Sequence, residues 1–253
     1  MIKVKNLEKS FQHKKILKGI SCTFKKGETS LIIGQTGAGK TVFLKCLLGL
    51  HEYDNGKIIF DNIELNKIGD YDKMKLKSSI GTVFQGSALF DSMTIEENVM
   101  FPLKMFQDME MEEMKIRVNE VLKRVELENS NNKKPSEASG GMKKRVAIAR
   151  AIVNQPKYLF CDEPNSGLDP KTAIVIDNLI KDITEEYKIT TVINSHDMNS
   201  VMEIGQKIVF LKNGKTEWQG DKNEIFRTEN KAVTDFVYSS NLYKKIRKMY
   251  LKK

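Results

Sequence analysis

The feature that most constrains the fold of this chain is a glycine-rich stretch at residues 34–41, which reads GQTGAGKT. It fits the pattern G-x-x-x-x-G-K-[ST], in which glycines let backbone N–H groups curve around an anion without a Cβ in the way. A short apolar run at residues 28–34 leads into it, and residues 40–50 have the spacing of a helix. Strand, loop and helix in this order place the positive end of a helix against the anion. The sequence therefore predicts a phosphate-binding loop at a strand-to-helix junction.

The last two residues of this loop have side chains that suit a bound triphosphate. Lys40 supplies a mobile positive charge for the β- and γ-phosphates, and Thr41 offers a hydroxyl group to Mg²⁺. The other loop residues that we expect to contact the nucleotide are Gly34, Gln35, Thr36, Gly37, Ala38 and Gly39.

Length and composition indicate a globular chain that does not span a membrane. The 253 residues suffice for one large α/β domain, or for a core with a small insert. We find no apolar run of about 18 residues and no apolar signal core at the N-terminus, so we expect neither a membrane span nor export. The three cysteines are isolated in apolar runs, which predicts buried thiols rather than a disulfide or a metal site.

Strands that alternate with helices predict a parallel core. We expect strands within residues 1–33, a hairpin at 56–65 around Asp61-Asn62, and a strand at 79–84. Residues 95–128 have helical spacing, and we interpret the region of about 90–150 as a helical insert. The remaining expected elements alternate: helix 141–154, strand 157–161, helix 171–187, strand 190–194, helix 198–204, strand 207–211 and a last strand after Asn213-Gly214.

Two adjacent carboxylates follow an apolar strand in the stretch YLFCDEP at residues 158–164. Consecutive side chains of a strand point to opposite sides, so we expect the two to have different roles. Asp162 would hold Mg²⁺ opposite Thr41. Glu163 would polarise the water that attacks the γ-phosphorus.

A second glycine-containing helix start lies in the stretch SGGM at residues 139–142, followed by KKRVAIARAI. Ser139 can cap this helix, and the glycines allow an anion to approach closely. Together with the motifs above, this stretch resembles the signature of ABC-type ATPases, and the resemblance extends over roughly residues 1–225. It implies a RecA-like P-loop NTPase core with an antiparallel β subdomain and an inserted helical subdomain. Residues 226–253, beyond the resemblance, form a basic tail.

The resemblance implies further site residues that bind ATP and Mg²⁺. Gln85, in TVFQ, matches the glutamine that senses Mg²⁺ and the attacking water, and His196, in NSHD, matches the switch histidine near the γ-phosphate. Phe11 matches the aromatic residue that stacks on adenine. The resemblance thus makes Glu163, His196 and Gln85 catalytic, and assigns Mg²⁺ to Thr41, Gln85 and Asp162.

The family pattern also requires a partner copy. In it the signature faces the phosphate loop of a second chain arranged head to tail, so two ATP molecules lie at a dimer interface. The residues that would contact the partner's nucleotide are Ser139, Gly140, Gly141 and Asp169. Hydrolysis would remove the γ-phosphate that links the two chains and let the dimer relax.

Without a membrane span, the work of hydrolysis must pass to transmembrane permease subunits. In the family a permease helix enters the cleft lined by the residues after Gln85, here GSALFDSMTIEENVMFPL. This stretch resembles the ATPase subunit of Mla-type lipid transporters that work with MCE-domain proteins, which predicts phospholipid trafficking at the inner face of the cell membrane. The alternative is another ABC importer or exporter, for an amino acid, a metal complex or a lipoprotein. A soluble ATPase of DNA repair or translation is disfavoured because long coiled coils and a second ATPase unit are missing, and we expect no nucleic acid partner.

Two features stay open at this stage. The tail from residue 236 onward carries basic and no acidic residues within a net charge of +9, which fits either a solvated helix or contact with anionic lipid or an acidic partner. Met105, Met109, Met111 and Met114 fit either core filling or an adaptable docking surface.

Overall fold

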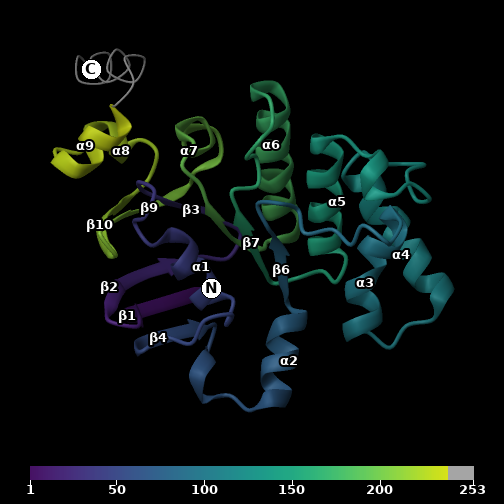
Figure 1. Cartoon of the computed structure of the whole chain (residues 1–253), viewed down its shortest axis with the longest axis horizontal. Coiled ribbons are helices and arrows are strands. Elements are labelled where there is room, and N and C mark those ends of the chain that lie inside the picture. Colours follow the sequence, from purple (N-terminus) through teal and green to yellow (C-terminus); the bar gives the residue numbers. More distant parts are fainter. Residues whose placement is uncertain (239–253) are drawn as a thin grey trace. The chain divides into compact units, whose positions relative to one another are not determined.

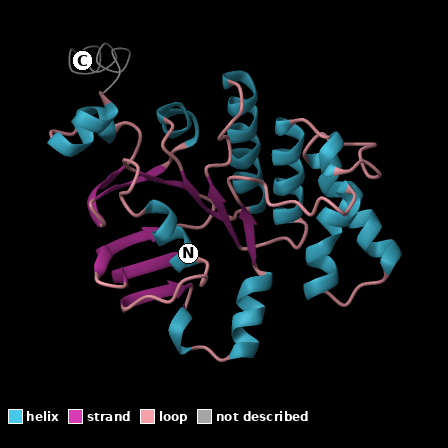
Figure 2. Cartoon of the chain, viewed as in Figure 1, coloured by secondary structure: helices cyan, strands magenta, loops and turns pink. Residues whose placement is uncertain are grey.

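The structure is a computed structural model that describes residues 1–238, and the chain divides into two compact units. Unit 1 comprises Met1–Ile68 and the chain from Val192 onward, and unit 2 comprises Gly69–Thr191. Figure 1 follows the chain through its elements, and Figure 2 distinguishes helices from strands. Among residues 1–238, no helix combines the length and apolar character that crossing a bilayer requires.

Unit 1 contains an antiparallel sheet of four strands in the order β2-β1-β4-β5. Buried and exposed residues alternate at the start of β1, as a sheet with one covered face requires. The predicted hairpin at 56–65 is confirmed, with Asp61 in the left-handed conformation at its turn (φ 51°). The strands are β1 (Ile2–Phe11), β2 (Lys14–Phe24), β4 (Asn55–Phe60) and β5 (Ile63–Glu64), and Figure 1 shows β2, β1 and β4 side by side.

The predicted parallel core begins in unit 1 with β3 (Thr29–Ile33), whose residues are all buried. It pairs in parallel with β9 (Lys207–Lys212), and β10 (Lys215–Gly220) pairs antiparallel with β9. The second half of β8 (Thr190–Asn194) continues next to β3.

Four α-helices of unit 1 lie among the described residues. The first helix stops at Leu47, three residues before the predicted end at residue 50, because Gly49 takes a left-handed conformation (φ 67°) that ends it. The two short helices after β10 were not predicted. The four are α1 (Lys40–Leu47), α7 (Met198–Ile204), α8 (Glu224–Arg227) and α9 (Lys231–Val237).

Unit 2 contains the parallel pair β6 (Ile80–Val83) and β7 (Tyr158–Asp162), with the first half of β8 next to β7. Helix α5 (Gly140–Ile152) packs closely on β6 because Gly81 has no side chain there: a Cβ at this position would collide with the carbonyl oxygen of Ala151. The other α-helices are α2 (Asp70–Ser78), α3 (Ile95–Phe106), α4 (Met111–Arg124) and α6 (Pro170–Tyr187).

The helical stretch predicted at 95–128 is confirmed as two helices, α3 and α4, which group with α5 in Figure 1. A capping box starts α3: the Thr94 hydroxyl accepts from the Glu97 N–H at 3.2 Å, and the Glu97 carboxylate accepts from the Thr94 N–H at 2.7 Å. The predicted apolar face is buried throughout, and its members are Val118, Val121, Leu122 and Val125.

The methionine cluster divides between the two open interpretations. Met114 is buried and Met109 is half-buried, whereas 55% of Met105 and 47% of Met111 is exposed. Core filling is therefore correct for Met114 and wrong for Met105 and Met111. The predicted buried thiols are confirmed for Cys22, Cys46 and Cys161. Residues 239–253, which hold most of the basic tail, lie outside the described residues.

Candidate functional site

The phosphate loop of unit 1 has the backbone that its sequence predicts. Gly34, Gly37 and Gly39 have φ angles of 149°, 81° and 102°, which residues with a Cβ rarely adopt. At Gly34 a Cβ would also collide with the carbonyl oxygen of Leu211 in β9. Gly39 serves as N-cap of α1 without a side-chain hydrogen bond. The first N–H groups of this helix are therefore available to an anion.

The side chain of Lys40 folds back over this loop. Its Nζ donates to the carbonyl oxygen of Gly34 at 2.9 Å and to that of Gln35 at 3.4 Å, and the residue is buried. A cation held at the mouth of a ring of backbone N–H groups makes a cradle for phosphate oxygens.

The strand β8 brings a second group to the same loop within unit 1. Asn194, which ends this strand, is fully buried and donates from Nδ2 to Thr41 Oγ1 at 3.4 Å. The next residue, Ser195, donates its N–H to the Ile32 carbonyl at 3.1 Å, next to the point where the chain leaves β3 for the loop. His196 follows at once and is exposed. Sequence reasoning found His196 and missed Asn194, whose only signal is its position in the stretch NSHD.

Phe11 ends β1 in the same unit. The residue is 40% exposed, and its ring makes a T-shaped contact with the ring of His51, with centroids 5.2 Å apart at an interplanar angle of 76°. The Lys9 ammonium lies 5.1 Å from the Phe11 centroid. The ring is thus held from two directions and keeps an open surface that a flat base could cover.

In unit 2, Gln85 and the two carboxylates occupy one edge of the β6–β7 pair. These strands are parallel, with Val83 opposite Cys161, so Gln85 and Asp162 both emerge at the carboxyl end. The expected strand alternation of Asp162 and Glu163 is wrong. Strand β7 ends at Asp162, and Glu163 has a left-handed backbone (φ 51°), so a turn rather than a pleat separates the two side chains.

Hydrogen bonds fix the surroundings of these residues within unit 2. Gln85 donates from Nε2 to Ser166 Oγ at 3.3 Å, and Asn165 donates from Nδ2 to the buried Asp177 at 3.3 Å. Lys144 of α5 is buried and donates from Nζ to the carbonyl oxygen of Gln85. Burial lowers the pKa of Lys144, while the carboxylates of Asp162 and Glu163 act in the opposite direction. Sequence reasoning missed Lys144, which lies between Lys143 and Arg145 and so does not stand out in the sequence.

The predicted cap of α5 is confirmed. The Ser139 hydroxyl accepts from the Met142 N–H at 3.2 Å. A Cβ at Gly141 would come within 2.9 Å of Thr172 Cγ2, and one at Gly140 within 3.5 Å of Leu168 Cδ2. The helix start therefore lies against the beginning of α6, within the same unit.

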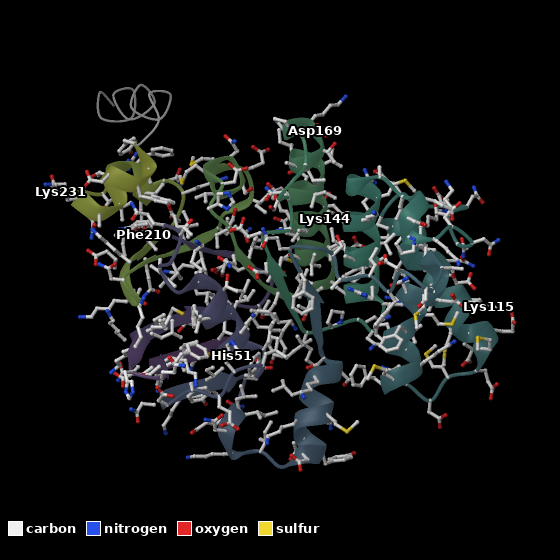
Figure 3. The ribbon with its side chains drawn as sticks, in the orientation of Figure 1. His51, Lys115, Lys144, Asp169, Phe210 and Lys231 are labelled. Carbon is white, nitrogen blue, oxygen red and sulfur yellow. The ribbon has the colours of Figure 1, made fainter. Side chains whose placement is uncertain are left out.

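Asp169 is the N-cap residue of α6. Its carboxylate caps α6 by accepting from the Thr172 N–H at 3.0 Å and from the Thr172 hydroxyl at 2.5 Å. These bonds hold the pKa of Asp169 below its usual value. Figure 3 labels Asp169 at the start of α6.

A largely apolar cavity of about 450 Å³ lies entirely within unit 2. The loop after β6 contributes Ala88 and Phe90, α3 contributes Phe101 and Met105, and α5 contributes Arg150. The prediction that residues after Gln85 line a cleft against the helical insert agrees with this lining.

Comparison with known proteins identifies the family. The model of the ABC transporter family matches residues 17–166. The methionine import ATP-binding protein MetN of Clostridium tetani is 40% identical over 226 residues, 89% of this chain and 71% of MetN. The spermidine/putrescine import ATP-binding protein PotA of Pasteurella multocida is 36% identical over 244 residues, 96% of this chain and 64% of PotA.

A solved structure gives the same result at the level of the fold. The dimeric structure of an ATP-binding cassette in a post-hydrolysis state, bound to ADP and Pi, is 36% identical with a TM-score of 0.80, over 87% of this chain and 98% of that one. The chain belongs to the ABC transporter family, as an ATP-binding subunit whose ATPase activity is coupled to transport. The predicted fold, a P-loop ATPase with an antiparallel β subdomain and a helical subdomain, is confirmed.

Proposed function

We propose that this chain is the ATPase subunit of an importer for an amino acid of the methionine type. The observation that carries the proposal is the 40% identity to MetN over 89% of the chain. The expected lipid trafficking with an MCE-domain protein has no support among the relatives described above, which import methionine or spermidine and putrescine. Amino acid import, included in the alternative from the sequence, is therefore the better interpretation.

The phosphate loop is proposed to bind the triphosphate of ATP through residues 34–41. The positive-φ glycines and the uncapped start of α1 support this, since Gly34, Gly37 and Gly39 let the backbone curve so that several N–H groups face one anion. Lys40 would exchange its carbonyl partners for phosphate oxygens. Phe11 would cover one face of adenine.

Mg²⁺ is part of the proposal because its predicted ligands are all oxygen donors. The Thr41 hydroxyl, the Gln85 side-chain carbonyl and the Asp162 carboxylate are the hard ligands that Mg²⁺ prefers. When bound, the ion neutralises charge on the phosphates and orients them for in-line attack. Glu163 would accept a proton from the attacking water, and His196 would donate a hydrogen bond near the γ-phosphate.

The functional form is proposed to be a head-to-tail dimer of two copies. Each ATP would lie between the phosphate loop of one protomer and the α5 start of the other, with Ser139, Gly140, Gly141 and Asp169 contributing in trans. A similar cassette that forms a dimer bound to ADP and Pi supports this arrangement.

The apolar cavity of unit 2 is the proposed docking site for a helix of the permease. Its lining by Phe90, Phe101 and Met105 suits an apolar helix face. We place the ATPase domain at residues 1–225 and the basic tail at 226–253. The protein would lie in the cytoplasm, on the inner face of the cell membrane.

The catalytic part is tested with Glu163→Gln, with Glu128→Gln at an exposed position as the control. Glu163→Gln should bind ATP with unchanged affinity, lower kcat by about 100-fold or more, and form a stable dimer with ATP in light scattering. Unchanged turnover would show that the general base is another residue.

The transported molecule is tested with the complex of this chain and its permease in proteoliposomes. ATPase stimulation is measured with L-methionine, spermidine or phospholipid in turn. Each substrate is added together with the solute-binding protein or membrane partner whose gene neighbours that of this chain. Stimulation and uptake with L-methionine support the proposal. Stimulation by phospholipid alone would restore the lipid interpretation, and stimulation by spermidine alone would assign a polyamine.

A further inference from the structure

The loop at residues 85–88, which joins Gln85 to the apolar cavity, has a backbone that its sequence does not favour. Ser87 and Ala88 have φ angles of 63° and 47°, in the left-handed region. Both residues carry a Cβ, and neither is the glycine or asparagine that usually occupies this region. Some other part of unit 2 must hold the loop in place.

Helix α5 supplies that hold through two cationic side chains. Lys144 Nζ donates to the Gln85 carbonyl, Arg150 NH2 donates to the Ser87 carbonyl at 2.8 Å, and Arg150 NH1 donates to the Ala88 carbonyl at 2.8 Å. Three of the four carbonyl groups of the loop therefore bond to one helix. A planar guanidinium is suited to two such acceptors at once because its donors have a fixed fork geometry.

Lys144 and Arg150 are shielded from solvent, unlike the cations of ordinary surface ion pairs. Only 5% of Lys144 is exposed, and burial lowers the pKa of both Lys144 and Arg150. A buried cation is costly unless its donors are matched by acceptors. Here the acceptors are loop carbonyls, and the carboxylates of Asp162 and Glu163 add a favourable field at Lys144.

Helix α5 also connects two proposed sites. It begins at the Ser139 cap, where the partner's nucleotide would bind, and Arg150 near its other end lines the apolar cavity together with Ala88. A helix of 13 residues is about 20 Å long and moves as a rigid body. A displacement at one end therefore reaches the loop at residues 85–88 directly.

We propose that Lys144 and Arg150 are positioning residues that fasten the loop at residues 85–88 to α5, so that movement of this helix sets the position of Gln85 and the shape of the cavity wall. The inference rests on the proposed function, since it assumes that Gln85 acts at the nucleotide and that a permease helix fills the cavity. It adds two residues whose contacts are to the loop backbone rather than to ATP.

The test compares Arg150→Lys with Arg145→Lys. Arg145 lies on the same helix and also bonds a carbonyl, that of Val125 at 2.8 Å, and the carboxylate of Glu126 at 2.5 Å, away from the loop. A lysine cannot bond two carbonyls in the fork geometry, so only Arg150→Lys loosens the loop. The kcat and the KM for ATP are measured for the full-length chain alone and in the permease complex.

Arg150→Lys should lower kcat about tenfold with KM for ATP within twofold, and abolish stimulation by the permease. A tenfold effect corresponds to about 1.4 kcal/mol. Arg145→Lys should keep both within twofold. Hydrogen exchange of the Ser87 amide, which donates to the Phe84 carbonyl at 2.9 Å, should accelerate about tenfold in Arg150→Lys only. Equal kinetics in the two variants, or a lower melting temperature with unchanged kcat, would overturn the proposal.

Two further variants keep the result interpretable. If Arg150→Lys does not fold, Lys144→Gln takes its place: a tenfold loss of kcat supports the proposal and an unchanged kcat overturns it. Wild type and Glu163→Gln are assayed in parallel. If they hydrolyse ATP equally, the proposed function has failed, whereas a normal difference between them with an unaffected Arg150→Lys refutes the positioning role alone.

Discussion

Removing the Phe11 ring is expected to weaken binding of the base while leaving binding of the phosphates intact. The Phe11 ring is held by the edge contact with His51, centroids 5.2 Å apart, and by the Lys9 ammonium at 5.1 Å, and 40% of the residue stays exposed. Stacking of a base on an aromatic side chain contributes about 1–3 kcal/mol, as judged by alanine substitution. Because 1.4 kcal/mol is a factor of ten, Phe11→Ala should raise the Kd for ATP by about 5-fold to 150-fold. We expect about tenfold, since the open surface of Phe11 serves one face of the base.

Titration calorimetry with two ligands isolates the contribution of the base. ATP is compared with inorganic tripolyphosphate, which occupies the phosphate loop and has no base. Phe11→Ala should weaken ATP alone, and Phe11→Tyr, which keeps the aromatic face, should bind both ligands like the wild type. An ATP Kd within twofold of the wild type in Phe11→Ala would refute the stacking role. Equal weakening of tripolyphosphate would show that Phe11 instead supports the loop.

Two predictions concern the fold. Gly81→Ala should destabilise the protein by about 1–3 kcal/mol, because its Cβ collides with the Ala151 carbonyl, and lower the melting temperature by about 2–12 °C. Gly69→Ala, which meets open space, is the control, and an equal effect of both would contradict the packing argument. Burial raises the pKa of Cys46 to about 11 and of Cys22 to about 12. At pH 8 only about one Cys46 thiol in a thousand is then ionised, so a disulfide reagent should label the native protein slowly and the unfolded protein at once. Rapid labelling of the native protein would refute this burial.

The elements that sequence analysis predicted correctly are those whose signal is local. Strand β3 is an apolar run ended by glycine, and α4 has an apolar face at helical spacing. Helix α2 was missed because it buries a single residue, Leu76, and exposes Tyr71 and Met74, so it has no apolar period to detect. Its observed contact is with β6, the next element along the chain.

In the candidate site, too, residues with a local sequence signal were predicted and residues that depend on distant partners were missed. The motif residues were identified because the residues that act together are close in the sequence, as in the phosphate loop. Lys144 and Arg150 were missed because their partners, the carbonyls of the loop at residues 85–88, lie 59 to 63 positions away in the chain. A backbone carbonyl carries no residue-type signal, so no pattern in the sequence could reveal these contacts. Asn194 was missed for a related reason, since its partner Thr41 is 153 positions away.

Three of the left-handed residues with a Cβ among residues 1–238 lie at or close to predicted site residues, whereas others, such as Asp61 and Lys188, lie at turns or helix ends. Ser87 and Ala88 come two and three residues after Gln85, and Glu163 is itself a predicted catalytic residue. Such a conformation costs about 1–3 kcal/mol per residue, and it persists only where the surroundings over-determine it. For the loop at residues 85–88 the surroundings are the charged hydrogen bonds from α5, each of which contributes about 1.5–3 kcal/mol. The strain at Ser87 and Ala88, about 2–6 kcal/mol in all, is therefore within what three such bonds contribute, about 4.5–9 kcal/mol. Loss of these bonds should leave the loop conformation without the support that offsets its strain.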